Sequence, residues 1–370
     1  MNSLFKKKAI IAFGSLLFCA NVLADDSHHH DVGMDVNSNG LKPVRADGHA
    51  PIGVMGEHMH KKGEWMLSYR YMHMDMEGNR IGDTSVSTDF IATSVANPNP
   101  GPATLRVVPT KMTMDMHMVG AMYAPTDWLT LMLMTMHVDK SMDHVTYMGA
   151  GTSTTIRGTF NTKSSGLGDT KVSGLINLYN KGAHHLHLNA GISLPTGDVD
   201  EVDDVLTPMG TTPTLRLPYA MQLGSGTFDL LPGITYTAKM DQLSWGAQYM
   251  GTIRTGSNNG YTWGDKQEVT SWISYQWKPW ISTSTRIAYS HEEQISGSDT
   301  LITAPVQTAD PSNYGGDVVM LNFGMNLAGQ TGRIRGHRLA AEVGIPLHRD
   351  LNGPQLETDL TVTAGWQYAF

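Results

Sequence analysis

Methionine recurs at nearly every second position of the stretch KMTMDMHMVGAMY, residues 111–123. Successive side chains of a β-strand point to opposite faces, so these methionines would share one face of an extended segment. A thioether sulfur is a soft ligand that suits Cu(I), and Ag(I) by the same chemistry, while the flexible side chain also fills irregular apolar space. The pattern indicates either a path for soft metal ions or a compliant apolar wall, and both interpretations stay open.

The segments on either side of this stretch repeat the pattern. If Trp65, Tyr123 and Leu131 face lipid, the alternate positions of all three segments face inward. The residues predicted to line the lumen in this way are Met66, Arg70, Met72, Met74, Met76, Met112, Met114, Met116, Met118, Met132, Met134 and Met136. Aligning the aromatic ends of the segments would place Met72, Met116 and Met136 at one level, although the register could shift by two residues without changing the face.

Histidine and carboxylate residues form a second pattern on the outward phase of the same segments. The alignment would bring His73, Asp115 and His137 side by side. An imidazole, a carboxylate and a second imidazole are donors that suit Zn(II) or Cu(II). The alternative is that these groups lie just beyond the membrane and meet only water and lipopolysaccharide.

The N-terminal part of the chain holds the densest set of metal donors. These are His49, His58, Met59 and His60. In an extended backbone His58 and His60 would share a face and Met59 would oppose them, so a tight site needs a turn. Histidine-rich segments also bind metal adventitiously, and the sequence does not decide between the two.

Later segments carry polar and charged residues on the phase predicted to face inward. They are His185, His187, Arg286, Glu342 and Asp359. Opposed charges inside a barrel hold strands or a plug in place, because a buried unpaired charge is costly. The same groups would also select solutes by their charge.

The N-terminus predicts export. Lys6, Lys7 and Lys8 precede an apolar run over residues 9–20 and small residues before a cleavage site near Ala24, which is typical of a secretory signal peptide. We therefore predict a signal peptide over residues 1–24, a periplasmic leader or plug rich in histidine and methionine over 25–62, and a barrel over 63–370.

The elements that position these residues are predicted to be strands. No later run approaches 18 apolar residues, which predicts no transmembrane helix. The C-terminal LETDLTVTAGWQYAF alternates apolar and polar residues up to Phe370, as a strand of a transmembrane barrel does. Strands are expected over residues 64–76, 111–124, 128–141, 168–180, 183–194, 226–238, 242–253, 265–278, 280–292, 315–328, 338–347 and 356–370.

Tight turns and long segments alternate between these strands. The long segments are 77–110, 142–167, 195–225, 254–264 and 293–314. Short periplasmic turns and long extracellular loops are typical of outer-membrane barrels. The sequence thus predicts an all-β fold, an antiparallel transmembrane β-barrel of about twelve strands in the bacterial outer membrane.

Two central segments resemble a known family. SGLGDTKVSGLINLYN (165–180) and HLHLNAGISLPTGDVD (185–200) are similar to the paired signature of the MetA-pathway-of-phenol-degradation family of outer-membrane channels. The matching parts are Gly166-Leu167-Gly168-Asp169 and Leu194-Pro195-Thr196-Gly197-Asp198. The resemblance spans roughly residues 60–370 and implies a barrel with a small-molecule transport role. The family pattern does not require such methionine and histidine density, so transport of aromatic compounds does not simply carry over.

Composition excludes several functions. The formal net charge is −8, and nucleic-acid binding needs a cationic surface. The only cysteine, Cys19, lies in the predicted signal peptide, which leaves no thiolate ligand. There is no G-x-S-x-G elbow and no evident catalytic triad, so we predict no enzyme and no required cofactor. Cu(I) or Ag(I) remains a candidate bound or transported ion.

Two functions from different classes therefore remain. The first is a channel or transporter for small solutes, either soft metal ions or aromatic and other apolar molecules. The alternative is a protein that sequesters copper or silver with its leader and uses the barrel as an anchor. Expected partners are outer-membrane lipid, lipopolysaccharide, the barrel-assembly machinery and the solute. A pore should conduct without residues 25–62, whereas a sequestering leader should not be dispensable.

Overall fold

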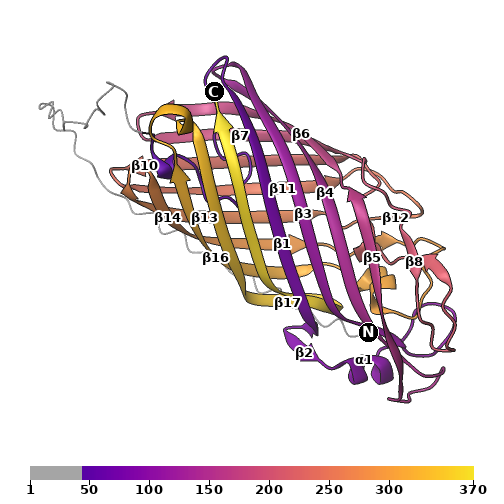
Figure 1. Cartoon of the computed structure of the whole chain (residues 1–370). Helices are drawn as coiled ribbons and strands as arrows, with labels where there is room; N and C mark the ends of the chain where they lie inside the picture. The colour runs from indigo at the N-terminus through magenta and orange to yellow at the C-terminus, as the bar shows by residue number, and fades with distance from the viewer. Residues whose placement is uncertain (1–43) are drawn as a thin grey trace, which may run out of the picture. The chain divides into compact units, whose positions relative to one another are not determined.

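A computed structural model describes residues 44–370, which form a closed antiparallel barrel (Figure 1). The ring contains, in order, β1 (Trp65–Gly82), β3 (Val107–Thr126), β4 (Leu129–Tyr147), β6 (Thr170–Lys181), β7 (His184–Leu194), β10 (Asp229–Met240), β11 (Leu243–Arg254), β13 (Lys266–Lys278), β14 (Ile281–Glu292), β16 (Gly316–Ala328) and β17 (His337–Ala369). β17 pairs back onto β1 and closes the ring. The predicted all-β barrel is confirmed. Within residues 44–370, no helix is long and apolar enough to cross a membrane.

The long element β17 supplies two antiparallel segments to the ring. Residues 338–351 pair with β16, and residues 351–369 pair with β1. The two halves also contact each other, since Thr361 Oγ1 donates to the Gly344 carbonyl oxygen over 3.5 Å. The eleven elements of the ring therefore provide twelve segments that cross the barrel, in agreement with the predicted number.

The prediction of a loop over residues 142–167 is wrong for most of that range. β4 continues to Tyr147, and β5 (Ile156–Leu167) pairs with its distal half from His137 opposite Leu167 to Tyr147 opposite Ile156. β6 takes over the pairing lower on β4, with Lys171 opposite Met134. β5 consists mainly of polar residues on both faces, so it lacks the alternation that identifies membrane-facing strands. Pairing with β4 satisfies its backbone groups instead.

The two ends of the barrel differ in their connections. At one end, the short-turn end, two residues join each of four strand pairs, and eight residues that include η5 (Gly332–Ile334) join β16 to β17. The short helix η1 (Ala46–Gly48) also lies there. The other, the long-loop end, carries the remaining small elements (Figure 1). They are β2 (Thr84–Val86), α1 (Thr88–Ser94), β8 (Val202–Asp204), β9 (Thr214–Arg216), η2 (Tyr219–Met221), β12 (Tyr261–Thr262), β15 (Ser296–Gly297), η3 (Gln307–Ala309) and η4 (Pro311–Asn313).

The long loops pack against one another around a small core of their own. Tyr219, Tyr261, Ile302 and Val306 are buried together there, and Tyr219 meets Tyr261 edge to face at 4.7 Å. Burial raises the pKa of Tyr261 to about 12, so its hydroxyl stays neutral at physiological pH. The loops thus form an ordered cap with its own apolar contacts.

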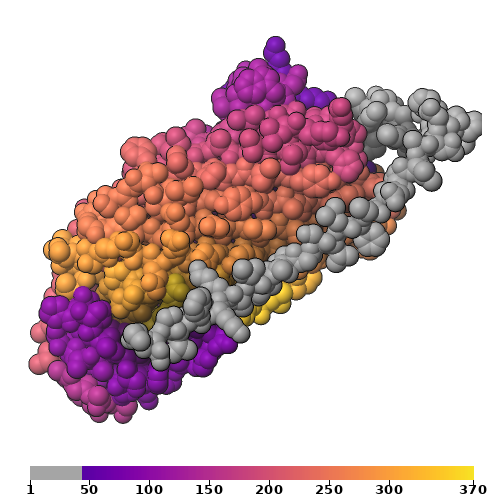
Figure 2. All heavy atoms as spheres, turned by 180° about the vertical axis from the view of Figure 1, so that it is seen from behind, coloured from indigo at the N-terminus to yellow at the C-terminus, as the bar shows by residue number. Residues whose placement is uncertain are grey.

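The barrel wall is apolar outside and polar inside. Leu131 is 45% exposed while Thr130 beside it is fully buried, and Val343 and Glu342 show the same contrast on β17. A soluble barrel would show the reverse, because its core would be apolar. From behind, the outer surface passes from magenta to orange in slanted bands as the strands succeed one another in sequence (Figure 2).

Candidate functional site

Residues 44–62 lie inside the barrel and are called the plug here. The segment enters and leaves at the short-turn end. Ala46 N–H donates to the Pro279 carbonyl (2.9 Å), and Gly63 N–H donates to the Ala124 carbonyl (2.8 Å). Between these points the plug reaches β17, where a Cβ on Gly53 would lie 2.3 Å from Glu342 Oε1. The predicted signal peptide and residues 25–43 of the predicted leader lie outside the described residues.

The wall supplies hydrogen-bond donors to the plug backbone. The plug has little regular structure, so its buried carbonyl oxygens need partners from elsewhere. The donor side chains and the residues whose carbonyls accept are Lys239 to Gly48, Asn326 to His49, Arg338 to Ala50, Gln248 to Met55, and His187 and Asn189 to Gly56. These donors come from five strands around the ring. The polar lumen residues therefore hold the plug in place.

Four of the five polar residues predicted to face inward lie in or against the lumen. Arg286 and Glu342 form a buried ion pair with an Nη2–Oε1 distance of 2.5 Å. His187 Nε2 lies 2.9 Å from the Gly56 carbonyl oxygen. His185 lines a cavity at the short-turn end.

Asp359 departs from its predicted inward position. A β-bulge in the β1–β17 ladder places Leu360 opposite Asp75 and Thr358 opposite Met76, so Asp359 has no partner on β1. Its side chain is 47% exposed and pairs with Arg349 over 3.3 Å. A bulge inserts one residue into a strand and reverses the facing of the residues beyond it, which strict alternation in the sequence does not reveal.

Arg70, predicted to face the lumen, is buried beneath the plug. The residue is 7% exposed, and its guanidinium group has no hydrogen bond to any of residues 44–370. Glu57 and Glu342 act on it electrostatically. The guanidinium therefore compensates these two buried carboxylates through space.

The methionine side chains of β1, β3 and β4 alternate with exposed residues such as Leu67 and Val119. Met72 lies opposite Met116, as the alignment at the aromatic ends predicts. Met136 lies opposite Met118 and not Met116, so its predicted level is wrong by two residues. The turn between β3 and β4 contains an irregularity at residues 123–126, and it sets this offset.

The methionines have three different surroundings along the barrel. At the short-turn end Met66 and Met122 pack with Leu175. At the long-loop end Met112 and Met142 pack with Leu217 of a loop. In between, the side chains that line a cavity are Met132, Met134 and Met136. Of the other predicted methionines, Met118 is buried. The half-buried ones are Met72, Met74, Met76, Met114 and Met116.

The central cavity, called the chamber here, has a volume of about 410 Å³. The plug residues Gly53 and Met55 form its floor, and loop residues 222–225 with Trp263 line its other end. The methionines of β4 form one side and Met250 lies on β11. The chamber is thus a lumen space enclosed by the plug and an inward-folded loop.

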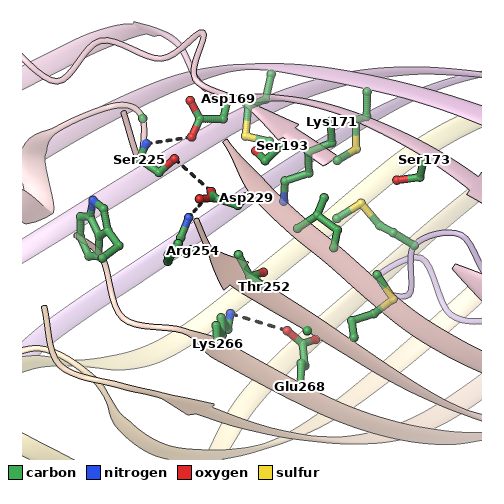
Figure 3. A pocket seen from close by; sticks show the side chains of 18 of the residues that line it. Asp169, Lys171, Ser173, Ser193, Ser225, Asp229, Thr252, Arg254, Lys266 and Glu268 are labelled. Carbon is green, nitrogen blue, oxygen red and sulfur yellow. Dashed lines mark hydrogen bonds and ion pairs between the residues drawn. The ribbon is translucent and has the colours of Figure 1, made fainter. Parts of the chain in front are cut away.

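Most charged groups around the chamber have partners (Figure 3). Arg254 Nη1 lies 2.5 Å from Asp229 Oδ2, and Lys266 Nζ lies 3.6 Å from Glu268 Oε2. Lys140 Nζ donates to two loop carbonyls over 2.9 and 2.6 Å. The two ion pairs are neutral overall, and the carbonyl oxygens solvate the ammonium group of Lys140 without neutralising it.

Lys171 differs from the other charged residues of the chamber in its lack of a partner in the described part of the chain. It lines the chamber (Figure 3), and it has no hydrogen bond or ion pair with any described residue. Arg254 and Lys266 act on it as repulsive charges, and the carboxylates of Asp169 and Glu268 act, to a smaller extent, as attractive ones. The chamber therefore contains one cation without a partner among residues 44–370. Sequence reasoning missed Lys171, although its spacing of two from the inward Ser173 would have identified it.

The two segments that carry the family resemblance meet at the chamber. Asp169 Oδ1 accepts from Gly197 N–H (3.0 Å), and its Oδ2 accepts from Ser225 N–H (2.8 Å). Thr196 Oγ1 donates to the Gly168 carbonyl over 2.8 Å. Asp169 thus ties the loop after β7 to the loop segment 222–225, which we call the roof.

The predicted row on the outer face forms only in part. His73 Nδ1 lies 2.8 Å from Asp115 Oδ1. His137 lies opposite His117, two residues along β3 from Asp115. Its Nε2 lies 3.2 Å from Ser165 Oγ. The two-residue offset that moves Met136 also moves His137, because both belong to β4.

The plug histidines come together around a carboxylate. His49 Nδ1 lies 3.2 Å from Glu57 Oε1, and His58 Nδ1 lies 2.9 Å from the same oxygen. His60 Nε2 lies 3.2 Å from His58 Nε2. Met59 instead packs near Met66 and Met122. Glu57, absent from the predicted set, is therefore central and Met59 is not.

Burial and neighbouring charges shift the pKa of His49 and of Glu57 in this cluster. Burial lowers the pKa of His49 to about 3, so its ring is neutral at pH 7. Burial alone would raise the pKa of Glu57, but the charge of His58 and the hydrogen bond from His49 outweigh it and hold the pKa well below its usual value. The cluster thus combines a neutral imidazole with an ionised carboxylate.

No family model matches the chain, and no curated protein matches its sequence. The COG4313 outer membrane channel from Pseudomonas putida F1 matches with a TM-score of 0.56 and 13% identity over 86% of this chain and 99% of that chain. The chain shares the fold of this channel. Two other solved structures are less similar, with TM-scores below 0.5. A Pseudomonas aeruginosa FadL homologue has a TM-score of 0.43 and 10% identity over 89% of this chain and 98% of that chain. A deletion mutant of the TodX monoaromatic hydrocarbon channel has a TM-score of 0.43 and 9% identity over 84% of this chain and 91% of that chain.

Proposed function

We propose that the chain is a channel of the bacterial outer membrane for small organic solutes that combine an apolar part with a negative charge. The observation that carries the proposal is the chamber, where methionines line one side and Lys171 has no partner among the described residues. A polarizable, flexible wall adapts to apolar groups of varied shape. An unpaired cation in a partly desolvated space attracts an anion strongly.

Several features support the location. The outer surface is apolar, and Trp65, Trp128 and Trp280 are exposed near the short-turn end, where an interfacial aromatic girdle belongs. The predicted signal peptide implies export, and the barrel shares the fold of an outer membrane channel. In this orientation the plug opens to the periplasm and the loop cap meets lipopolysaccharide. The resemblance to the phenol-degradation family points the same way, toward a small organic solute.

The test compares three ring compounds of similar size and different charge: benzoate, benzyl alcohol and benzylammonium. Isothermal titration of the detergent-solubilised protein should give the tightest binding for benzoate. Lys171→Met should remove this preference while leaving benzyl alcohol binding unchanged. Lys181→Met on the same strand, at an exposed position outside the chamber, is the matched control. Equal affinity for all three compounds in the parent protein would contradict the proposal.

A second candidate function is transport of soft metal ions. The observation that favours it is that Met132, Met134 and Met136 line one chamber with Met55 and Met250, which concentrates thioether sulfur at one place. The packing of the methionines at both ends of the barrel favours instead an adaptable apolar filling. The organic-solute channel is therefore the preferred proposal.

Silver titration separates the two. A variant with Met72, Met114, Met116, Met134 and Met136 changed to leucine keeps apolar volume and removes sulfur. A loss of Ag(I) affinity of about tenfold or more in the folded variant would assign a soft-metal path. Similar weak binding by both proteins would leave the methionines as an apolar wall for organic solutes.

A further inference from the structure

The plug brings three metal-donor groups together from its two legs. His49 lies on the leg that enters the barrel, and Glu57 and His58 lie on the leg that returns. One donor atom from each of the three lies within 4.8 Å of the others. No other such group of histidine, cysteine, aspartate and glutamate occurs within residues 44–370. The plug backbone therefore folds so that residues eight apart converge.

The cluster has a nitrogen that hydrogen bonding leaves unused. His58 Nδ1 is buried without a hydrogen-bond partner in the described part of the chain, although it lies 2.9 Å from Glu57 Oε1. Glu57 itself is only 3% exposed. A buried polar atom without a partner calls for an explanation, and a bound ion is one that fits a cluster of metal donors. The carboxylate of Glu57 also interacts electrostatically with the buried Arg70 and Arg338.

We propose that His49, Glu57 and His58 bind a divalent transition-metal ion, Zn(II) or Cu(II), within the plug. Two imidazoles and one carboxylate are a donor set that these ions take in proteins. Mg(II) and Ca(II) prefer oxygen ligands in greater number. Cu(I) and Ag(I) prefer sulfur, and Met59 packs against the cluster of Met66 and Met122. This inference stands apart from the organic solute of the chamber.

An entry route exists at the short-turn end. A cavity of about 630 Å³ is lined by all three donors and also by Asp127, His185 and Lys239 near the turns. His60 also lines it and lies beside His58, so a small side-chain rotation would offer a fourth nitrogen. A bound ion would tie the two legs of the plug together and hold it folded in the lumen.

Zinc titration of the full chain tests the site. His28, His29 and His30 also offer imidazoles, so all proteins carry asparagine at these positions. After treatment with a chelator, ZnCl₂ is titrated against a chromophoric competitor in detergent. We expect one tight equivalent, and we expect His49→Asn and His58→Asn each to weaken it by at least about tenfold. His348→Asn, exposed on β17, should leave the affinity unchanged.

Zinc-edge X-ray absorption of the loaded parent protein provides an independent result that needs no variant to fold. Nitrogen and oxygen donors at about 2.0–2.2 Å, with imidazole scattering, support the site. Sulfur scattering near about 2.3 Å would assign the ion to methionine and overturn the proposal. The absence of a tight equivalent, or unchanged affinity in both histidine variants, would overturn it as well.

Discussion

At the scale of single residues, the plug and the wall fit with almost no free space at Gly53. A Cβ there would meet Glu342 Oε1 at 2.3 Å and Arg286 Nη2 at 2.5 Å, whereas a Cβ on Gly48 would have no neighbour closer than 3.9 Å. Both glycines belong to the plug. The close approach at Gly53 therefore means that glycine is needed for the tip of the plug to reach the ion pair.

Gly53→Ala should displace the plug, because an added methyl group cannot enter without moving a buried ion pair. We expect a loss of about 1–3 kcal/mol in the free energy of unfolding and a rise in single-channel conductance. Planar-bilayer recordings and denaturant titration check both. Gly48→Ala is the matched control and should behave as the parent protein; a conductance rise in both variants would contradict the argument.

Replacing one partner of the Arg286–Glu342 ion pair should destabilise the barrel more than replacing both partners. Arg286→Met leaves a buried carboxylate unpaired and should cost about 3–5 kcal/mol. The double variant Arg286→Met with Glu342→Leu should recover most of this loss, because no buried charge of the pair remains. Denaturant unfolding in detergent measures the difference. Equal destabilisation of the single and double variants would show that the pair is not isolated from other charges.

At the scale of elements, Asp169 joins the break between β5 and β6 to both ends of the connection between β7 and β10. It lies at the break between β5 and β6, and it accepts hydrogen bonds from Gly197 and Ser225. Gly197 and Gly224 are in contact, since a Cβ on Gly197 would lie 2.6 Å from Gly224 Cα. This arrangement accounts for the aspartate at position 169 and for the glycines at positions 197 and 224.

Asp169→Ala should loosen the roof, because two backbone N–H groups lose their acceptor at a cost of about 1–3 kcal/mol each when they stay buried. Limited proteolysis should then cleave within residues 197–225, where the parent protein resists. Asp203→Ala is the control, since Asp203 accepts from Lys163 N–H in an exposed loop. Equal resistance of parent and Asp169→Ala proteins would show that the roof is held by other contacts.

At the scale of the whole molecule, ring closure and plugging are separate features. β1 pairs with β17 from Met66 opposite Ala369 up to Gly82 opposite Leu351, and none of these backbone pairs involves the plug. The plug instead relies on side chains of the finished wall. The barrel should therefore fold without residues 44–62.

Deleting residues 44–62 should leave a folded barrel with a larger conductance, because the floor of the chamber is removed. Planar-bilayer recordings measure the conductance, and heat-dependent gel mobility checks the fold. This result would support a pore. A folded deletion variant that remains closed would favour a barrel that only anchors its N-terminal segment.

The sequence indicated much of the wall and only part of the site. Alternation identified the strands that carry Met116 and Arg286, because lipid outside and polar groups inside impose a period of two. It did not identify Lys171 or Glu57 as site residues. Spacing places Lys171 on the inward face, but its lack of a partner within residues 44–370 is visible only when the other charges of the chamber are located, and Glu57 becomes distinctive only when the plug turns back on itself.

The sequence by itself therefore determined which face most strand residues occupy, since facing depends on local backbone geometry except where a bulge intervenes. Tertiary structure alone decided the levels. The register of β4 against β3 differs by two residues from the prediction for His137 and Met136. A bulge lies beside Asp359, and the fold of the plug brings His49 to Glu57. The physical reason is that register depends on turn geometry and on the hydrogen bonds of the neighbouring strand. These interactions join residues far apart in the chain, which a period of two cannot encode.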